Sequence, residues 1–93
     1  MNRLYIGIAE DRDVQAVYYK EIICRELAGH ELHLKHYQSA EDCLADHAFL
    51  EEADIFLIDI QLEGSSGIEL GKRLIKTYPQ IKIIFISGYI RYA

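Results

Sequence analysis

The sequence predicts an α/β fold built on a doubly wound parallel sheet. Segments with the two-residue apolar period of strands alternate with segments of helical spacing, in the order β-α-β-α-β-α-β. Such alternation favours parallel strands with helices packed on both faces of the sheet. The 93 residues, about half of them apolar, fit one small domain with a single core.

The first two elements are a strand over residues 4–9 and a helix that begins near Val14. The strand ends at an acidic pair, and its apolar run is too short for a signal-peptide core or a membrane span. We therefore expect a cytoplasmic protein. The helix stripe that would face the sheet consists of Ala16, Ile23 and Leu27, with Val17 and Cys24 at its flanks.

The two cysteines, Cys24 and Cys43, are separated by more than the spacing of a CxxC motif, and each falls in a helix-like segment. We expect both thiols to be reduced and at least half-buried.

Residues 32–37 alternate apolar and polar side chains, which suits a strand at the edge of the sheet. Its histidines, His33 and His36, are expected to face solvent. The alternative is a zinc site with the candidate ligands His30, His33, His36 and His47. Because His33 and His36 point to opposite faces of a strand, one ion would not easily engage both.

A short helix is expected from Ser39, whose hydroxyl can cap the first turn, to about His47. Residues 54–59 then form the most continuous apolar run after the first, which is typical of a central strand buried on both faces. This strand ends on a carboxylate, Asp59.

The next helix begins after Ser65 or Ser66, either of which can cap it, and stops before Pro79. Its inward stripe comprises Ile68, Gly71, Leu74, Ile75 and Tyr78. Residues 81–86 form a fourth strand, which we expect to be buried. No repeat, low-complexity tract or linker interrupts residues 1–93, so we expect a single domain.

Acidic and hydroxyl side chains follow the ends of three predicted strands. Glu10 and Asp11 follow the first strand, Asp59 ends the third and Ser87 follows the fourth. In an open parallel sheet, ligands gather at the carboxyl ends of the strands, where the winding reverses direction. Carboxylates a few ångströms apart repel by roughly 4 kcal/mol per pair at an effective dielectric of about 20, so a cation is implied.

Mg2+ suits this composition because it prefers oxygen ligands and usually takes one or two carboxylates together with phosphate oxygens. An aspartate beside such an ion can act as the nucleophile that accepts a phosphoryl group.

These residues and their spacing resemble the receiver domain of two-component response regulators over nearly the whole chain. Leu62 and Gly67, which lie three and eight residues after Asp59, match an apolar residue and a helix-opening glycine of that family. The resemblance implies a flavodoxin-like doubly wound parallel sheet, here truncated after the fourth strand. It also implies a sensor histidine kinase that phosphorylates Asp59.

The resemblance further implies a role for each site residue. The ligands of Mg2+ would be Glu10, Asp11, Asp59 and the backbone carbonyl of Gln61. Ser87 would sense the phosphoryl group, and Tyr89 would belong to the switch region.

The sequence departs from the family at two places. Glu63 stands where receivers usually have a proline, and the lysine of the family's fifth strand has no counterpart before Ala93. The alternative function is therefore a receiver-shaped interaction or dimerisation module without a working phosphorylation cycle. The last helix, strand and helix of the family are also absent from residues 1–93. We accordingly predict a homodimer, or exchange of elements, through the exposed edge of the fourth strand.

The sequence also bears on three further function classes. The net charge of −5 and the lack of a Lys/Arg cluster argue against direct binding of nucleic acid or an anionic membrane. An aspartate-dependent phosphatase of the haloacid dehalogenase type needs a second aspartate at the position of Gln61. We therefore expect that this chain is not an enzyme. The residues after Ser87 resemble receivers coupled to LytTR-type DNA-binding domains, which implies a part in transcription regulation.

Overall fold

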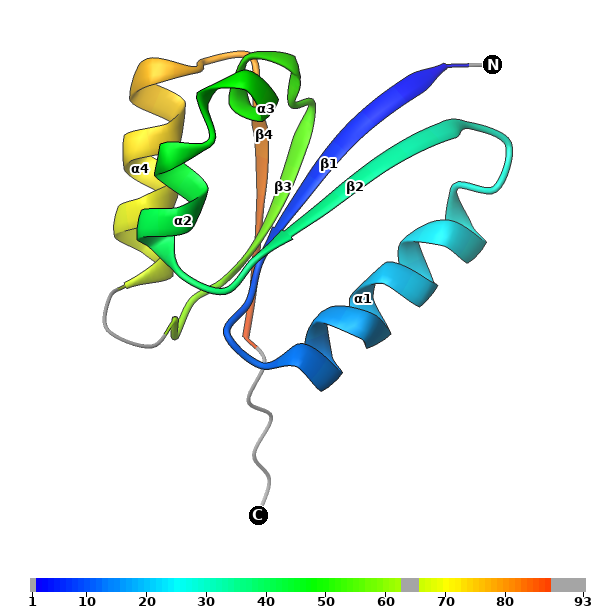
Figure 1. The fold of residues 1–93 in the computed structure, drawn as a ribbon, viewed down its shortest axis with the longest axis horizontal. Helices are drawn as coiled ribbons and strands as arrows, with labels where there is room; N and C mark the ends of the chain where they lie inside the picture. Colours follow the sequence, from blue (N-terminus) through cyan, green and yellow to red (C-terminus); the bar gives the residue numbers. More distant parts are fainter. Residues whose placement is uncertain (1, 63–65, 88–93) are drawn as a thin grey trace.

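The computed structural model describes residues 2–62 and 66–87. Its elements follow one another as β1 (Arg3–Ala9), α1 (Asp13–Glu26), β2 (Glu31–Tyr37), α2 (Ala40–Ala45), α3 (His47–Glu52), β3 (Ile55–Asp59), α4 (Gly67–Thr77) and β4 (Lys82–Ile86). The four strands form one parallel sheet, with α1 on one face and α2, α3 and α4 on the other (Figure 1). The predicted α/β architecture is confirmed.

The strand order β2-β1-β3-β4 places β1 and β3 side by side at the centre of the sheet. The chain leaves β1 towards β2, at one edge, and then returns past β1 to form β3, so the winding reverses between β1 and β3. Residues that follow β1 and residues that end β3 therefore meet at one edge of the sheet. β2 is an edge strand, as its alternating pattern predicted.

The larger part of the core lies between the sheet and the helices α2, α3 and α4. Phe56 of β3 is fully buried there, and its ring stacks on Tyr37 with centroids 6.0 Å apart. Phe49 of α3 meets the same ring edge-on at 6.1 Å. A Cβ at Gly7 would overlap the Phe56 ring, so glycine lets this ring lie against the backbone of β1.

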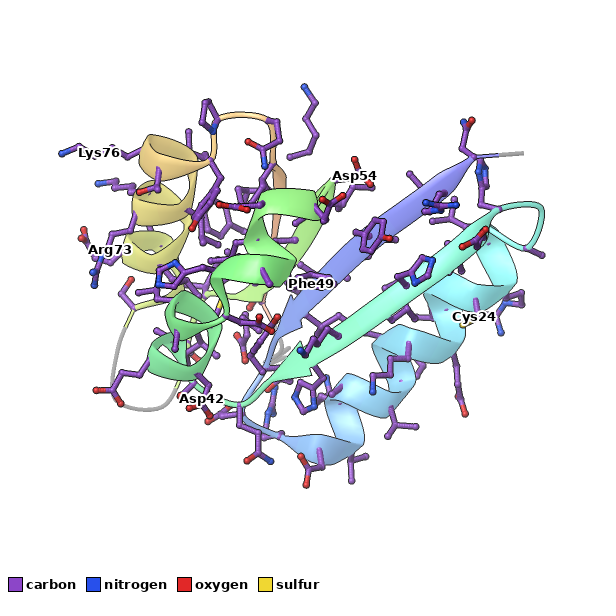
Figure 2. All side chains as sticks on the ribbon, turned by 45° about the horizontal axis from the view of Figure 1, so that its top comes forward. Cys24, Asp42, Phe49, Asp54, Arg73 and Lys76 are labelled. Carbon is purple, nitrogen blue, oxygen red and sulfur yellow. The ribbon has the colours of Figure 1, made fainter. Side chains whose placement is uncertain are left out.

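The smaller part of the core lies under α1, where Ala16, Tyr19 and Ile23 are buried. The prediction for Val17 and Cys24 is wrong, because Val17 is 53% exposed and Cys24 is exposed on the outer side of α1 (Figure 2). Each of them lies about 100° around the helix axis from a buried residue. The contact stripe of α1 is therefore centred on Tyr19, which the sequence analysis did not include.

The prediction that the fourth strand is buried is also wrong. Within the described part of the chain β4 pairs with β3 alone, and Ile84 and Phe85 are 51% and 42% exposed. α1 lies over β1 and β2, and the face of β4 that carries Ile84 lies beyond it. On α4, Leu70, Gly71 and Leu74 are buried, whereas the predicted stripe members Ile68 and Ile75 are exposed.

The two helix caps that the sequence predicted are present. The hydroxyl of Ser39 accepts a hydrogen bond from the backbone N–H of Asp42 at 3.1 Å, and Ser66 accepts from the first turn of α4. The single helix expected up to His47 is instead two short helices that join at Asp46. No helix in residues 2–62 or 66–87 has the length and apolar character needed to cross a membrane.

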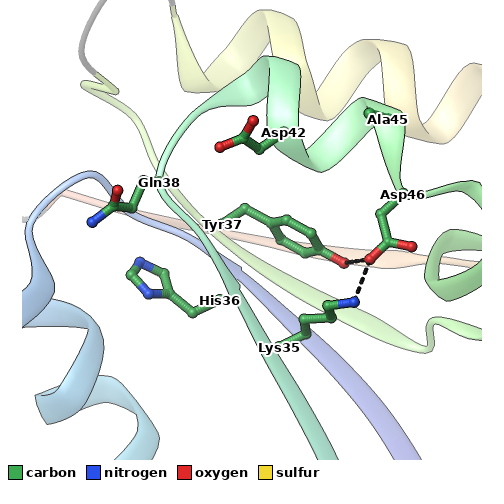
Figure 3. Close-up of a pocket in the computed structure, with 7 residues that line it drawn as sticks. All are labelled: Lys35, His36, Tyr37, Gln38, Asp42, Ala45 and Asp46. Atoms are coloured by element: carbon green, nitrogen blue, oxygen red, sulfur yellow. Dashed lines mark hydrogen bonds and ion pairs between the residues drawn. The ribbon is translucent and has the colours of Figure 1, made fainter.

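Asp46 breaks the helix because its carboxylate has three partners. It caps α3 by accepting from the backbone N–H of Phe49 at 3.3 Å. It also pairs with Lys35 Nζ at 2.7 Å and accepts from the Tyr37 hydroxyl at 2.8 Å (Figure 3). The bonds from Lys35 and Tyr37 hold the pKa of Asp46 below its ordinary value.

Replacing Asp46 by alanine is expected to lower the free energy of unfolding by about 2 kcal/mol, because α3 loses its cap and the buried Tyr37 hydroxyl loses its acceptor. A carboxyl whose folded pKa is depressed stabilises the fold above its unfolded pKa, near 3.8, and that contribution is lost as the pH falls through the folded pKa. The difference between wild type and Asp46→Ala in urea unfolding should therefore shrink between neutral and strongly acidic pH. The exposed Asp42 provides the control, Asp42→Ala, and an Asp46→Ala deficit that is constant with pH would contradict this account.

Candidate functional site

Three carboxylates meet at the carboxyl edge of the sheet, where the sequence predicted a cation site. One ligand atom from each of Glu10, Asp11 and Asp59 lies within 4.8 Å of the others. Glu10 and Asp59 are buried, with 0% and 2% exposure, and Asp11 is half-buried. Among the residues that the structure describes, no other group of three or more metal-ligating side chains comes together. The four histidines of the zinc alternative are thus not gathered at one site.

The Glu10 carboxylate has one oxygen with partners and one without. Its Oε2 accepts hydrogen bonds from the backbone N–H of Arg12 at 3.1 Å and from Arg12 Nε at 3.3 Å. Its Oε1 is buried with no hydrogen-bond partner. A buried carboxylate oxygen without a partner is costly, so the donor set fits a hard cation such as Mg2+.

The ionisation of Glu10 reflects the same environment. Burial raises the pKa of Glu10, and the neighbouring carboxylates of Asp11 and Asp59 raise it further, against the lowering effect of the hydrogen bonds from Arg12. The charged form of Glu10 is therefore disfavoured in the metal-free site, and a bound cation would favour it.

Asp59 presents two different oxygens to the site. The backbone N–H of Gln61 donates to Oδ1 at 2.9 Å, while Oδ2 lies 3.7 Å from Arg12 Nη2. The turn after Asp59 is fixed at both sides: the N–H of Ile60 donates to the carbonyl of Ile86, and the N–H of Gly67 donates to the carbonyl of Ile60 at 2.8 Å. One carboxylate oxygen is thus held by the backbone, and the other faces a cationic side chain.

Arg12 is the site residue that the sequence analysis missed. It is the N-cap residue of α1, its side chain makes no capping hydrogen bond, and it reaches Glu10 and Asp59 instead. The hydrogen bond to Glu10 raises the pKa of Arg12. The available signal was its place directly after the acidic pair, in the loop that leads from the strand end into the helix.

The structure places the other predicted residues as follows. Gln61 contacts Asp59 through its backbone N–H, and the use of its carbonyl as a metal ligand stays a prediction. Ser87 is exposed and follows Ile86, the β4 partner of Asp59, so it lies at the same edge of the sheet. Its sensing of a phosphoryl group also stays a prediction. Tyr89 and Glu63 lie outside the described residues.

His36 supports the site from the side of β2. Its Nε2 lies 2.6 Å from the backbone carbonyl oxygen of Glu10, and the residue is half-buried. The expectation that both histidines of β2 face solvent is therefore wrong for His36, which contacts the backbone of Glu10.

A surface pocket lies beside β2 and α2 (Figure 3), and none of the three acids of the cluster lines it. Its lining consists of Lys35, His36, Tyr37, Gln38, Asp42, Ala45 and Asp46. Lys35, Tyr37 and Asp46 satisfy one another there. The acidic cluster, with its partnerless buried oxygen, is the stronger candidate for a functional site.

Comparison with known proteins agrees with this geometry. The family model of the response regulator receiver domain matches residues 6–93. The CheY-like receiver domain protein from Methanospirillum hungatei JF-1 is 28% identical over 95% of this chain and 66% of its own, with a TM-score of 0.67. The response regulator PhyR from Brucella abortus is 29% identical over 91% of this chain and 33% of its own, with a TM-score of 0.73.

The fold also matches the BeF3-activated receiver domain of DrrB, a Thermotoga maritima protein, at 20% identity and a TM-score of 0.74, over 89% of this chain. The chain covers 64% of that receiver, so it spans less than two thirds of its length. The curated proteins contain no match. The family match includes both strand ends that supply the carboxylates and confirms the flavodoxin-like fold with four parallel strands. The chain belongs to the response regulator receiver domain family.

Proposed function

We propose that this chain is a phosphoacceptor signalling module in which Asp59 receives a phosphoryl group from a sensor histidine kinase in the cytoplasm. The observation that carries the proposal is the buried Asp59 carboxylate beside Glu10, whose Oε1 has no partner. Membership of the receiver family supports a role in two-component signalling. We place Asp59 Oδ2 as the nucleophile, because the N–H of Gln61 already occupies Oδ1.

The transfer is a displacement at phosphorus. Asp59 Oδ2 forms the new P–O bond while the P–N bond of the kinase phosphohistidine breaks, and the electrons of that bond stay on the imidazole nitrogen, which takes up a proton. Mg2+ would be held by the side chains of Glu10, Asp11 and Asp59 and by the carbonyl of Gln61, and it would offset charge on the carboxylates and the phosphoryl oxygens. Ser87 would donate a hydrogen bond to the phosphoryl group. The phosphoryl group stays on the chain's own aspartate, so we propose no enzymatic turnover.

The test is phosphorylation by a small acyl phosphate in the presence of Mg2+. Intact-protein mass spectrometry should show the gain of one phosphoryl group by the wild type and none by Asp59→Asn. Asp42→Asn, which changes an exposed aspartate on α2, is the matched control and should be modified like the wild type. A wild type that gains no mass, or an Asp59→Asn variant that gains as much, would refute the proposal.

A second candidate is an interaction or dimerisation module, and the exposed side chains of β4 favour it. Ile84 and Phe85 project from an edge strand whose only strand partner in the described residues is β3. An exposed apolar edge strand is a template for pairing with a second copy. Sedimentation velocity at micromolar concentration is expected to show a dimer for the wild type and a monomer for Ile84→Lys. A wild type that sediments as a monomer would count against this candidate.

A further inference from the structure

Arg12 brings a positive charge to the acidic cluster before any metal is bound. Its Nε lies 3.3 Å from Glu10 Oε2 and its Nη2 lies 3.7 Å from Asp59 Oδ2. One guanidinium thus links the buried carboxylate that follows β1 to the one that ends β3. Both belong to the set of acids that would hold a cation.

The Arg12 guanidinium lies at the protein surface, whereas the two carboxylates that it contacts are buried. The Arg12 side chain is 47% exposed, whereas those of Glu10 and Asp59 are 0% and 3% exposed. It makes no cap for α1, and the backbone N–H of Arg12 holds Glu10 Oε2 independently of the side chain. Movement of the guanidinium away from the carboxylates therefore breaks no helix cap and leaves the backbone hydrogen bond to Glu10 Oε2 in place.

We propose that Arg12 is a built-in counter-ion that competes with Mg2+ for Glu10 and Asp59 and pairs with the phosphoryl group once Asp59 carries it. The inference rests on the proposed function. Two positive groups cannot share the Glu10 and Asp59 carboxylates without mutual repulsion, so the guanidinium moves aside when the metal enters. Asp59 Oδ2 is the oxygen that would bear the phosphoryl group, and the guanidinium fork lies close enough to bind its oxygens.

The test measures two affinities of the same chain. The first is the affinity for Mg2+ alone, and the second is the affinity for beryllium trifluoride, a phosphoryl analogue, at saturating Mg2+. Thermal shift and tyrosine fluorescence report both. Arg12→Ala is expected to bind Mg2+ about 10-fold more tightly and the trifluoride about 10-fold more weakly, each change equivalent to roughly 1.4 kcal/mol. A merely structural role would weaken both affinities, so the opposite signs are the signature of the counter-ion.

Two further variants make the result specific. Arg12→Lys keeps a charge and should retain the competition with Mg2+, whereas the neutral Arg12→Gln should behave like Arg12→Ala while keeping a donor for Glu10. Arg25→Ala removes an exposed arginine of α1 that pairs with Glu26 and should change neither affinity.

The outcomes separate the two proposals. Unchanged or weaker Mg2+ binding by both neutral variants, or trifluoride binding equal to that of the wild type, overturns the role of Arg12 and leaves the proposed function intact. Absence of Mg2+ binding in the wild type and in every Arg12 variant overturns the proposed function together with this inference.

Discussion

Replacing Phe56 by alanine is expected to lower the free energy of unfolding by about 4 kcal/mol. The Phe56 side chain is fully buried, and its ring contacts Tyr37 by stacking and Phe49 edge-on, so truncation removes these contacts and leaves a cavity at the centre of the core. A small domain is stable by only about 5–15 kcal/mol, so this single change removes a large share of the total. Urea unfolding followed by circular dichroism measures it.

Phe85→Ala is the matched control, because it removes the same side chain from an edge strand where 42% of it is exposed. We expect a loss of less than about 1.5 kcal/mol there. Equal losses from the two substitutions would show that the core is not centred on Phe56.

Replacing Gly67 by alanine is expected to cost about 3 kcal/mol, at the upper end of overpacking effects. A Cβ at this position would overlap the carbonyl oxygen of Asp59 and lie 2.9 Å from the Cα of Ile60. These atoms belong to the backbone and cannot rotate away as a side chain can, so the turn after β3 must move. The same movement displaces Asp59, and we expect Mg2+ binding to weaken with stability.

Gly29→Ala provides the control, because an added Cβ there has no heavy atom within 4 Å. Its free energy of unfolding should stay within about 0.5 kcal/mol of the wild-type value. The two measurements are urea unfolding and the thermal shift caused by Mg2+. If Gly67→Ala keeps the stability and the Mg2+ response of the wild type, the turn after β3 can accommodate a Cβ and the prediction is wrong.

The topology and the acidic cluster were predictable because both follow from the order of the elements. Alternating strands and helices require parallel strands with crossovers, and the carboxyl ends of such strands lie at one edge. Glu10 and Asp59 directly follow or end two of these strands, so their meeting needed no knowledge of side-chain packing.

The predictions are wrong where packing against a neighbouring element determines which side chains are buried or where a helix ends. Helical spacing locates an apolar stripe only to within about one residue, so Val17 and Ile75 were assigned to faces that the structure exposes. The apolar run of β4 has the composition of a central strand, but its burial depends on which helix lies over it. The sequence pattern puts Asp46 inside a single helix, because it does not show that Lys35 and Tyr37 of β2 bind its carboxylate.

Arg12 was missed for a related reason. An arginine at the start of a helix is ordinarily a solvated side chain, and only the three-dimensional approach of β1 and β3 puts two buried carboxylates within its reach. The sequence shows the charged residues, whereas the structure shows that the Arg12 guanidinium contacts both Glu10 and Asp59.

The close approach of Gly67 to Asp59 has a mechanical consequence. The first residue of α4 touches the carbonyl of Asp59 with no side chain between them, and its N–H is bonded to the carbonyl of Ile60. The peptide between Asp59 and Ile60 therefore cannot move towards α4 or away from it unless the first residue of α4 moves with it. A displacement of this peptide would therefore also move the first turn of α4, an 11-residue helix whose outer face bears Arg73 and Lys76 (Figure 2).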